Sequence, residues 1–103
     1  MTYTASDIAR YIVSYCFRKR KPVSNLKLQK MLYYMWIEYY KKTKKSLFND
    51  DICAWQFGPV IPDIYYAFCA YAGRPITKEY WIALDDDDRE KIDKIIEEYL
   101  PIP

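Results

Sequence analysis

The chain contains no histidine, and this absence limits the chemistry that its side chains can perform. Without an imidazole, nucleophilic catalysis by a Ser-His or Cys-His pair, His-containing zinc sites and a histidine pH switch are all excluded. The sequence also lacks a glycine-rich phosphate-binding loop and any readable pair of catalytic carboxylates. We therefore predict no catalytic residues, no cofactor and no enzymatic activity.

The remaining candidate metal ligands are cysteines and aspartates. Cys16, Cys53 and Cys69 are odd in number and widely spaced, without a C-x-x-C pair, which is typical of reduced small hydrophobes. The aspartate run 85–88 opens a predicted helix, where carboxylates satisfy free amides and complement the helix dipole. We interpret the run as capping, with a cation site as the alternative, and predict no metal site.

The basic residues raise the question of nucleic-acid binding. The net charge is only +2, but residues 1–46 hold 11 Lys and Arg against 2 acids, and residues 47–103 hold 5 against 12. Such a split suggests a nucleic-acid partner for the basic half. The clusters at 18–21 and 41–45 lie near opposite ends of a predicted helix about 25 Å long, so they form no continuous track. We expect solvated helix ends, and nucleic-acid or regulatory binding through the clusters is the alternative.

Twelve tyrosines in 103 residues favour a protein-binding surface. Neighbours on a helix point about 100° apart, so the pairs 33–34, 39–40 and 65–66 cannot both face one core. Exposed tyrosine rings are typical of protein interfaces, because a rigid amphipathic ring buries much area at little entropy cost. Half-buried rings with wet hydroxyls are the alternative for each tyrosine. Our candidate partner-binding residues are Tyr33, Tyr34, Tyr40 and Tyr66.

Apolar periodicity predicts helices in the N-terminal half. Thr4 and Asp7 form a capping-box-like start for a helix that ends in the basic run 18–21. Ser24 caps a second helix over residues 25–42, which carries two apolar faces. We therefore expect the second helix to be the central one, covered on two sides or offering its second face to a partner.

A corner built on a glycine and two prolines follows in mid-chain. Residues 52–57 are too few for a stable helix and predict a short extended segment or strand, which Gly58 and Pro59 end. We expect Trp55 and Phe57 to lie beneath the crossing. Glycine is then needed because a residue without Cβ allows a close approach.

Two further helices are predicted after the corner. Pro62 opens a third helix, which Gly73 is expected to end. Residues 75–81 are ambiguous between loop and strand, and the last helix covers residues 85–100. Together, these elements predict a mainly α fold: one compact domain over residues 1–103, with about four to five helices around the second helix.

The sequence shows neither a secretory leader nor a membrane span. The N-terminal segment lacks a basic region followed by an apolar run, and no window approaches 18 consecutive apolar residues. We therefore expect a cytoplasmic protein with no membrane contact.

Two blocks of the sequence together carry a family resemblance. The first is LQKMLYY at 28–34, and the second is AWQFGPVIPDIY at 54–65. In type, order and distance they resemble the KLQKLLYY-like helix and the AW-x-x-GPV-x-P-x-(V/I)-Y corner of the Panacea antitoxin domain, a family also described as SocA-like or phage-associated GepA-like. The motif residues, expected to be mainly structural, are Leu28, Gln29, Lys30, Leu32, Tyr33, Tyr34, Ala54, Trp55, Gly58, Pro59, Val60, Pro62 and Tyr65.

The resemblance implies an antitoxin. Family members are mostly small bacterial and prophage proteins of mainly helical fold, which bind and neutralise toxins encoded beside them. The implied partner is a protein toxin from the adjacent gene, with nucleic acid not expected. Occlusion of the toxin and its delivery to a protease both stay open, as does the oligomeric state. Many members continue past the acidic last helix with a Ser/Leu pattern and a His-Trp-containing end, so we predict a member that is short at the C-terminus.

Overall fold

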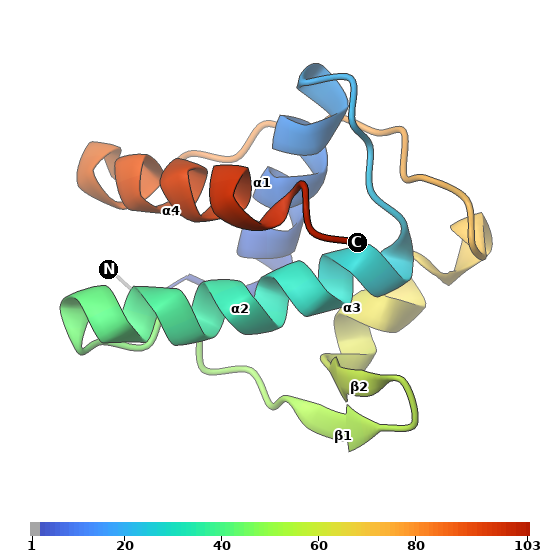
Figure 1. The fold of residues 1–103 in the computed structure, drawn as a ribbon, viewed down its shortest axis with the longest axis horizontal. Coiled ribbons are helices and arrows are strands. Elements are labelled where there is room, and N and C mark those ends of the chain that lie inside the picture. The colour runs from blue at the N-terminus through green and yellow to red at the C-terminus, as the bar shows by residue number, and fades with distance from the viewer. Residues whose placement is uncertain (1–2) are drawn as a thin grey trace.

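The computed structural model describes residues 3–103 and is mainly α-helical, which confirms the predicted fold class (Figure 1). Two long helices lie side by side, a third crosses behind them, and a small hairpin projects from one end. In chain order the elements are α1 (Ala5–Arg18), α2 (Asn25–Thr43), β1 (Cys53–Trp55), β2 (Gly58–Val60), α3 (Pro62–Ala67), the 3-10 turn η1 (Cys69–Tyr71) and α4 (Asp86–Tyr99).

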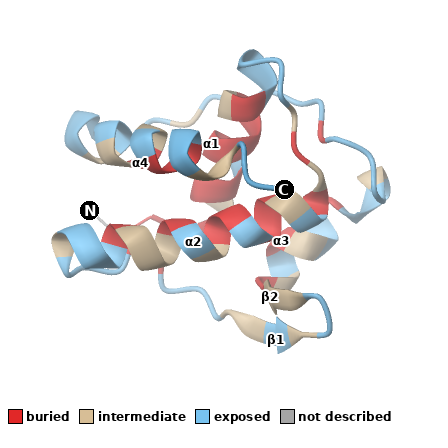
Figure 2. Ribbon diagram, viewed as in Figure 1, coloured by how far each residue is buried: buried red, intermediate tan, exposed pale blue. Residues whose placement is uncertain are grey.

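Helix α2 is the centre of the fold, as predicted. It contacts α1, α3, α4 and β2, and α4 lies along it in the opposite chain direction (Figure 1). Its side chains Leu28, Leu32 and Met35 are buried in the core, which Figure 2 shows between the three long helices. The second apolar face of α2 remains partly open, because Leu26 and Tyr40 are 43% and 49% exposed.

The predicted helix starts of α1 and α2 are confirmed. The Thr4 hydroxyl accepts the Asp7 N–H at 3.0 Å, and the Asp7 carboxylate accepts the Thr4 N–H at 3.2 Å, which completes a capping box. Ser24 Oγ accepts the Lys27 N–H at 3.2 Å. These caps satisfy backbone donors that have no partner inside the helix.

The predicted short strand before Gly58 is confirmed as β1, but the chain returns along it as β2, so the mid-chain corner is a β-hairpin that the sequence did not predict. Strands β1 and β2 pair antiparallel with Trp55 opposite Gly58, so Gln56 and Phe57 form a two-residue turn. Gly58 has a φ of +114°, and no atom lies within 4 Å of a Cβ added there. Glycine is therefore needed for its backbone conformation, and our expectation of a close approach was wrong. Phe57, expected beneath the crossing, is 61% exposed at the turn.

Helix α3 is shorter than the sequence predicted. The N–H of Phe68 is shared between the carbonyls of Ile64 and Tyr65 at 3.3 Å each, where the α-helix gives way to the 3-10 turn. Ala72, and not Gly73, takes the positive φ that follows this turn. The ambiguous segment 75–81 has no regular secondary structure.

Tyrosine hydroxyls fasten α4 to the rest of the fold. Tyr3 and Tyr39 donate to the two carboxylate oxygens of Asp88 at 2.8 Å each. Asp88 therefore joins the N-terminal segment and α2 to the first turn of α4. The aspartate run 85–88 was predicted to cap α4, but the Asp85 side chain at the N-cap makes no capping bond. The prediction is correct only in that the other three aspartates lie in the first turn, where their charges complement the helix dipole. Two similar bonds follow along α4, from Tyr11 to Asp93 and from Tyr15 to Glu97.

The Asp88 bonds predict a loss of stability at alkaline pH. Burial and the bond to Asp88 raise the pKa of both Tyr3 and Tyr39 to about 12. Between pH 10 and 12 the unfolded chain then releases these protons while the folded chain keeps them, so the free energy of unfolding falls as pH rises. We expect Tyr3→Phe/Tyr39→Phe to flatten this fall in urea titrations, with the exposed Tyr40→Phe as control. An unchanged slope in the double variant contradicts the role of Asp88.

The positive φ of Gly58 predicts a strained alanine. We expect Gly58→Ala to lower the free energy of unfolding by about 1 to 3 kcal/mol, because an L side chain rarely adopts this conformation. Gly73→Ala is the matched control, since it has the same open surroundings without a positive φ. Urea unfolding followed by circular dichroism measures both. Equal midpoints for the two variants count against the hairpin geometry.

Candidate protein-docking groove

The two sequence blocks of the family resemblance meet through buried hydrogen bonds. Gln29 on α2 is 2% exposed, and its Oε1 accepts the N–H of Ile61 at 2.9 Å. Its Nε2 donates to Oδ1 of Asn25 at 3.2 Å, and Asn25 Nδ2 donates to the carbonyl oxygen of Tyr65 at 2.9 Å. Since Ile61 precedes α3 and Tyr65 lies within it, these three bonds fix the hairpin-to-α3 connection against α2.

Asn25 is a buried residue that links α2 to α3, and sequence analysis missed it. It is 3% exposed and occupies the first position of α2, directly after the Ser24 cap. An asparagine next to a cap resembles an ordinary helix start, so the sequence offers no sign that its side chain turns inward to α3. Only the distance between Asn25 Nδ2 and the Tyr65 carbonyl reveals its role.

The other motif residues divide between the core and the surface, so the motif supports the fold and also reaches solvent. Leu28, Leu32 and Val60 are buried. Tyr33, Trp55, Gly58, Pro59, Pro62 and Tyr65 are half-buried, and Lys30, Tyr34 and Ala54 are exposed.

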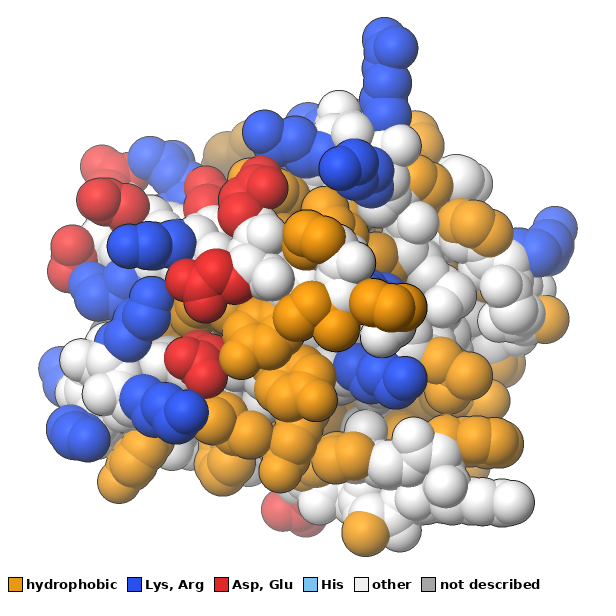
Figure 3. All heavy atoms as spheres, viewed as in Figure 1, with side chains coloured by type: hydrophobic (Ala, Val, Ile, Leu, Met, Phe, Trp, Pro, Cys, Tyr) orange, Lys and Arg blue, Asp and Glu red, His pale blue; other side chains and the backbone are white. Residues whose placement is uncertain are grey.

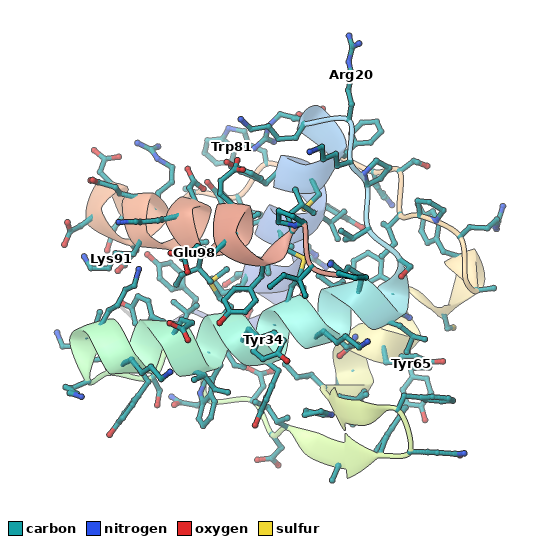
Figure 4. The ribbon with its side chains drawn as sticks, in the orientation of Figure 1. Arg20, Tyr34, Tyr65, Trp81, Lys91 and Glu98 are labelled. Atoms are coloured by element: carbon teal, nitrogen blue, oxygen red, sulfur yellow. The ribbon has the colours of Figure 1, made fainter. Side chains whose placement is uncertain are left out.

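An open groove of about 210 Å³, here called the docking groove, lies over α2 between the hairpin and the C-terminal segment. The rings of Tyr34 and Tyr99 stack within it, with centroids 4.7 Å apart and planes 8° from parallel. Tyr33 lies beside them, with its ring centroid 5.8 Å from that of Tyr34. Figure 3 shows the hydrophobic side chains gathered on this face, and Figure 4 shows Tyr34 projecting from α2.

The rim of the docking groove exposes large apolar side chains. Phe57 at the hairpin turn is 61% exposed, Ile102 is 49% exposed and Tyr34 is 40% exposed. Contiguous exposed apolar side chains with polar neighbours are typical of interaction surfaces. Sequence analysis did not assign the groove residues that the hairpin turn and the C-terminal part of the chain contribute, because only the folded chain brings these segments to α2: Phe57, Tyr99, Ile102 and Pro103.

Both charged side chains that line the docking groove are basic. Lys27 and Lys30 line it one helical turn apart, and neither forms an ion pair with any of residues 3–103. Burial, and then repulsion from Lys30, lower the pKa of Lys27. Glu38 accepts a hydrogen bond from Tyr99 at 3.2 Å and pairs with Lys41 at 3.4 Å, so its charge is already engaged.

The four candidate partner-binding tyrosines do not share one site. Tyr33 and Tyr34 line the docking groove. Tyr40 is exposed on α2 and does not line it, and Tyr66 is 62% exposed beside Trp55, with ring centroids 6.0 Å apart. A role of these residues in binding stays a prediction, and the structure divides them between at least two surfaces.

Each basic cluster has at least one member paired with an acidic side chain, and Lys41 with Glu38 is the pair in the cluster at 41–45. Arg18 pairs with Glu79 at 3.4 Å, and Lys19 lies 3.8 Å from Glu97. Figure 3 shows basic and acidic side chains intermixed on the left of the view and separate basic side chains elsewhere, with no continuous basic band on this face. This arrangement does not favour a phosphate-binding track.

The three cysteines were predicted to behave as small hydrophobic residues, and only one of them is buried. Cys16 is buried, and burial raises the pKa of its thiol to about 11. Cys53 is half-buried and Cys69 is exposed, because Cys69 falls in the 3-10 turn after the shortened α3. Within residues 3–103, no helix is long and apolar enough to cross a membrane, and no three acidic or cysteine side chains are grouped to hold a metal ion.

Comparison with known proteins gives one family and two relatives. The family model described as "Antitoxin SocA-like, Panacea domain" matches residues 28–102. Antitoxin SocA of Caulobacter vibrioides (strain NA1000 / CB15N) is 33% identical over 88 residues, which cover 73% of this chain and 47% of that protein. Maturase K of Keteleeria davidiana is 36% identical over 62 residues, 52% of this chain but only 12% of that protein. The chain thus spans about half the length of SocA and a much smaller share of Maturase K. No solved structure matches it.

The Gln29 bonds predict a fold that is sensitive to one buried amide. We expect Gln29→Met to lower the free energy of unfolding by about 1 to 3 kcal/mol, because the buried Ile61 N–H loses its acceptor. Gln56→Met makes the same chemical change at the exposed hairpin turn and should stay within about 0.5 kcal/mol of wild type. Urea unfolding measures both variants, and wild-type stability of Gln29→Met would falsify this assignment.

Proposed function

The chain belongs to the family of SocA-like antitoxins with a Panacea domain, and from this premise we propose that it neutralises a protein toxin by binding it directly. The toxin is encoded in the adjacent gene, and the complex forms in the cytoplasm without a catalytic step by this chain. Family membership, carried by the match over residues 28–102, is the observation on which the proposal depends.

The docking groove is the surface that we assign to the toxin. Its volume of about 210 Å³ is below the roughly 300–1,000 Å³ of ordinary small-molecule pockets, so it suits a protein side chain better than a whole ligand. Its rim carries the exposed rings of Tyr34 and Phe57. Aromatic anchors of this kind supply most of the binding energy at protein interfaces.

The groove is also held in shape before a partner arrives. The Gln29 bonds fix the hairpin-to-α3 connection against α2, and Tyr99 of α4 stacks on Tyr34 while donating to Glu38. A surface that is already ordered loses less conformational entropy on binding. Preorganisation therefore supports a tight complex on a modest area.

Co-expression tests the proposal. Growth should be restored when the wild-type chain is expressed with the product of the adjacent reading frame, and the two proteins should co-elute in gel filtration. Phe57→Ala and Tyr34→Ala should each weaken the complex about tenfold or more, because they remove aromatic anchors. Trp81→Ala is the matched control, since Trp81 is 88% exposed but lies outside the docking groove (Figure 4).

Two outcomes contradict this account in different ways. If co-expressing cells die as fast as cells with the neighbour alone and no complex elutes, the chain is not an antitoxin for that protein. If Trp81→Ala abolishes rescue while both groove variants rescue normally, the toxin binds the face that carries Trp81. Circular dichroism of each variant separates loss of binding from loss of fold.

A further inference from the structure

We propose that the docking groove recognises an acidic segment of its partner, with one large apolar side chain seated against Tyr34 and Phe57 and flanking carboxylates facing Lys27 and Lys30. This inference rests on the proposed function for the identity of the partner. The acidic and apolar character of the bound segment is inferred from the side chains that line the groove.

The two lysines supply the charge complementarity. Both line the groove, and their spacing of three residues places them on one side of α2. Several other basic residues, including Arg18, Arg89 and Lys91, pair with acids of this chain. Lys27 and Lys30 pair with none of residues 3–103, so their charges are available to a partner.

The surroundings of Lys27 favour an arriving carboxylate. Burial disfavours its charged form, and the neighbouring charge of Lys30 does so further, which lowers the pKa of Lys27. A carboxylate placed beside both ammonium groups offsets the repulsion between them. A basic segment would add a third positive charge at the same place and is therefore rejected.

The apolar part of the groove determines which side chain of the partner can bind there. The stacked rings of Tyr34 and Tyr99 lie on one side, and the exposed ring of Phe57 lies on the hairpin. The volume of about 210 Å³ suits one large side chain, and a small-molecule pocket is usually larger. An apolar anchor surrounded by polar contacts is the usual arrangement of a binding hot spot.

The first experiment measures affinity for the product of the adjacent reading frame. We expect Lys27→Gln/Lys30→Gln to weaken the complex about 3- to 30-fold and to reduce its dependence on salt. The matched control is Lys42→Gln/Lys45→Gln, which removes the same charge from two exposed lysines beyond the groove and should stay within about twofold of wild type. Isothermal titration calorimetry at two salt concentrations gives both values.

A second experiment tests the groove without the toxin. A synthetic peptide with one tryptophan between glutamates is titrated to millimolar concentration into the ¹⁵N-labelled chain, beside a peptide with lysines in place of glutamates. The acidic peptide should shift the amide signals of Tyr34 and Phe57, and the basic peptide should not. Absent shifts, or equal shifts from both peptides, overturn the inference.

The two experiments separate the failures. If the neighbour binds but the two double variants bind it equally well, recognition by an acidic segment is wrong while the antitoxin function stands. If the neighbour does not bind but the acidic peptide occupies the groove, the function fails and the inference stands. If sedimentation shows a dimer that Lys27→Gln/Lys30→Gln alters, the occupant is a second copy of this chain and the inference is wrong.

Discussion

The buried amide of Gln29 joins parts of the chain that are 32 residues apart, and the position of the hairpin depends on it. An amide side chain both donates and accepts, so Gln29 accepts from Ile61 while donating to Asn25. In a low-dielectric interior such bonds are strong, and an unpaired member is costly, which leaves one favourable arrangement. One wall of the docking groove is therefore fixed by a polar contact in the core beneath it.

The opposite wall depends on how α4 is attached. The carboxylates of α4 accept hydrogen bonds from tyrosine hydroxyls of the N-terminal segment, α1 and α2. Asp88 accepts two of these bonds, from Tyr3 and Tyr39. This explains part of the charge asymmetry, because the acidic half of the chain binds the other half through tyrosines as well as through basic residues. It also explains part of the tyrosine excess. Many of these rings are internal donors, so a high tyrosine count overstates the binding surface.

The elements that the sequence predicted are those whose signals are local. Capping by Thr4 and Ser24 and the apolar periodicity of α2 depend on neighbours within a few residues. The hairpin was missed because its turn, Gln56-Phe57, lacks the usual Asn-Gly signal, and because Pro59 argues against a strand. A strand with a free edge tolerates such a proline. Of the residues that line the docking groove, the sequence identified Tyr33 and Tyr34 as partner-binding candidates. Phe57, Tyr99 and Ile102 come from segments that only the fold brings to α2.

The groove exists only in the folded chain, since its lining comes from α2, the hairpin turn and the C-terminal segment. A protein that binds this surface has no equivalent target on the unfolded chain, so its binding free energy adds to the free energy of unfolding. At a hundred times its dissociation constant, such a partner stabilises the fold by about 2.7 kcal/mol. The bound chain is then opened, and reached by proteases, about a hundredfold less often than the free chain. For a chain whose partner binds in this way, the rate of proteolysis depends on how much of the chain is bound.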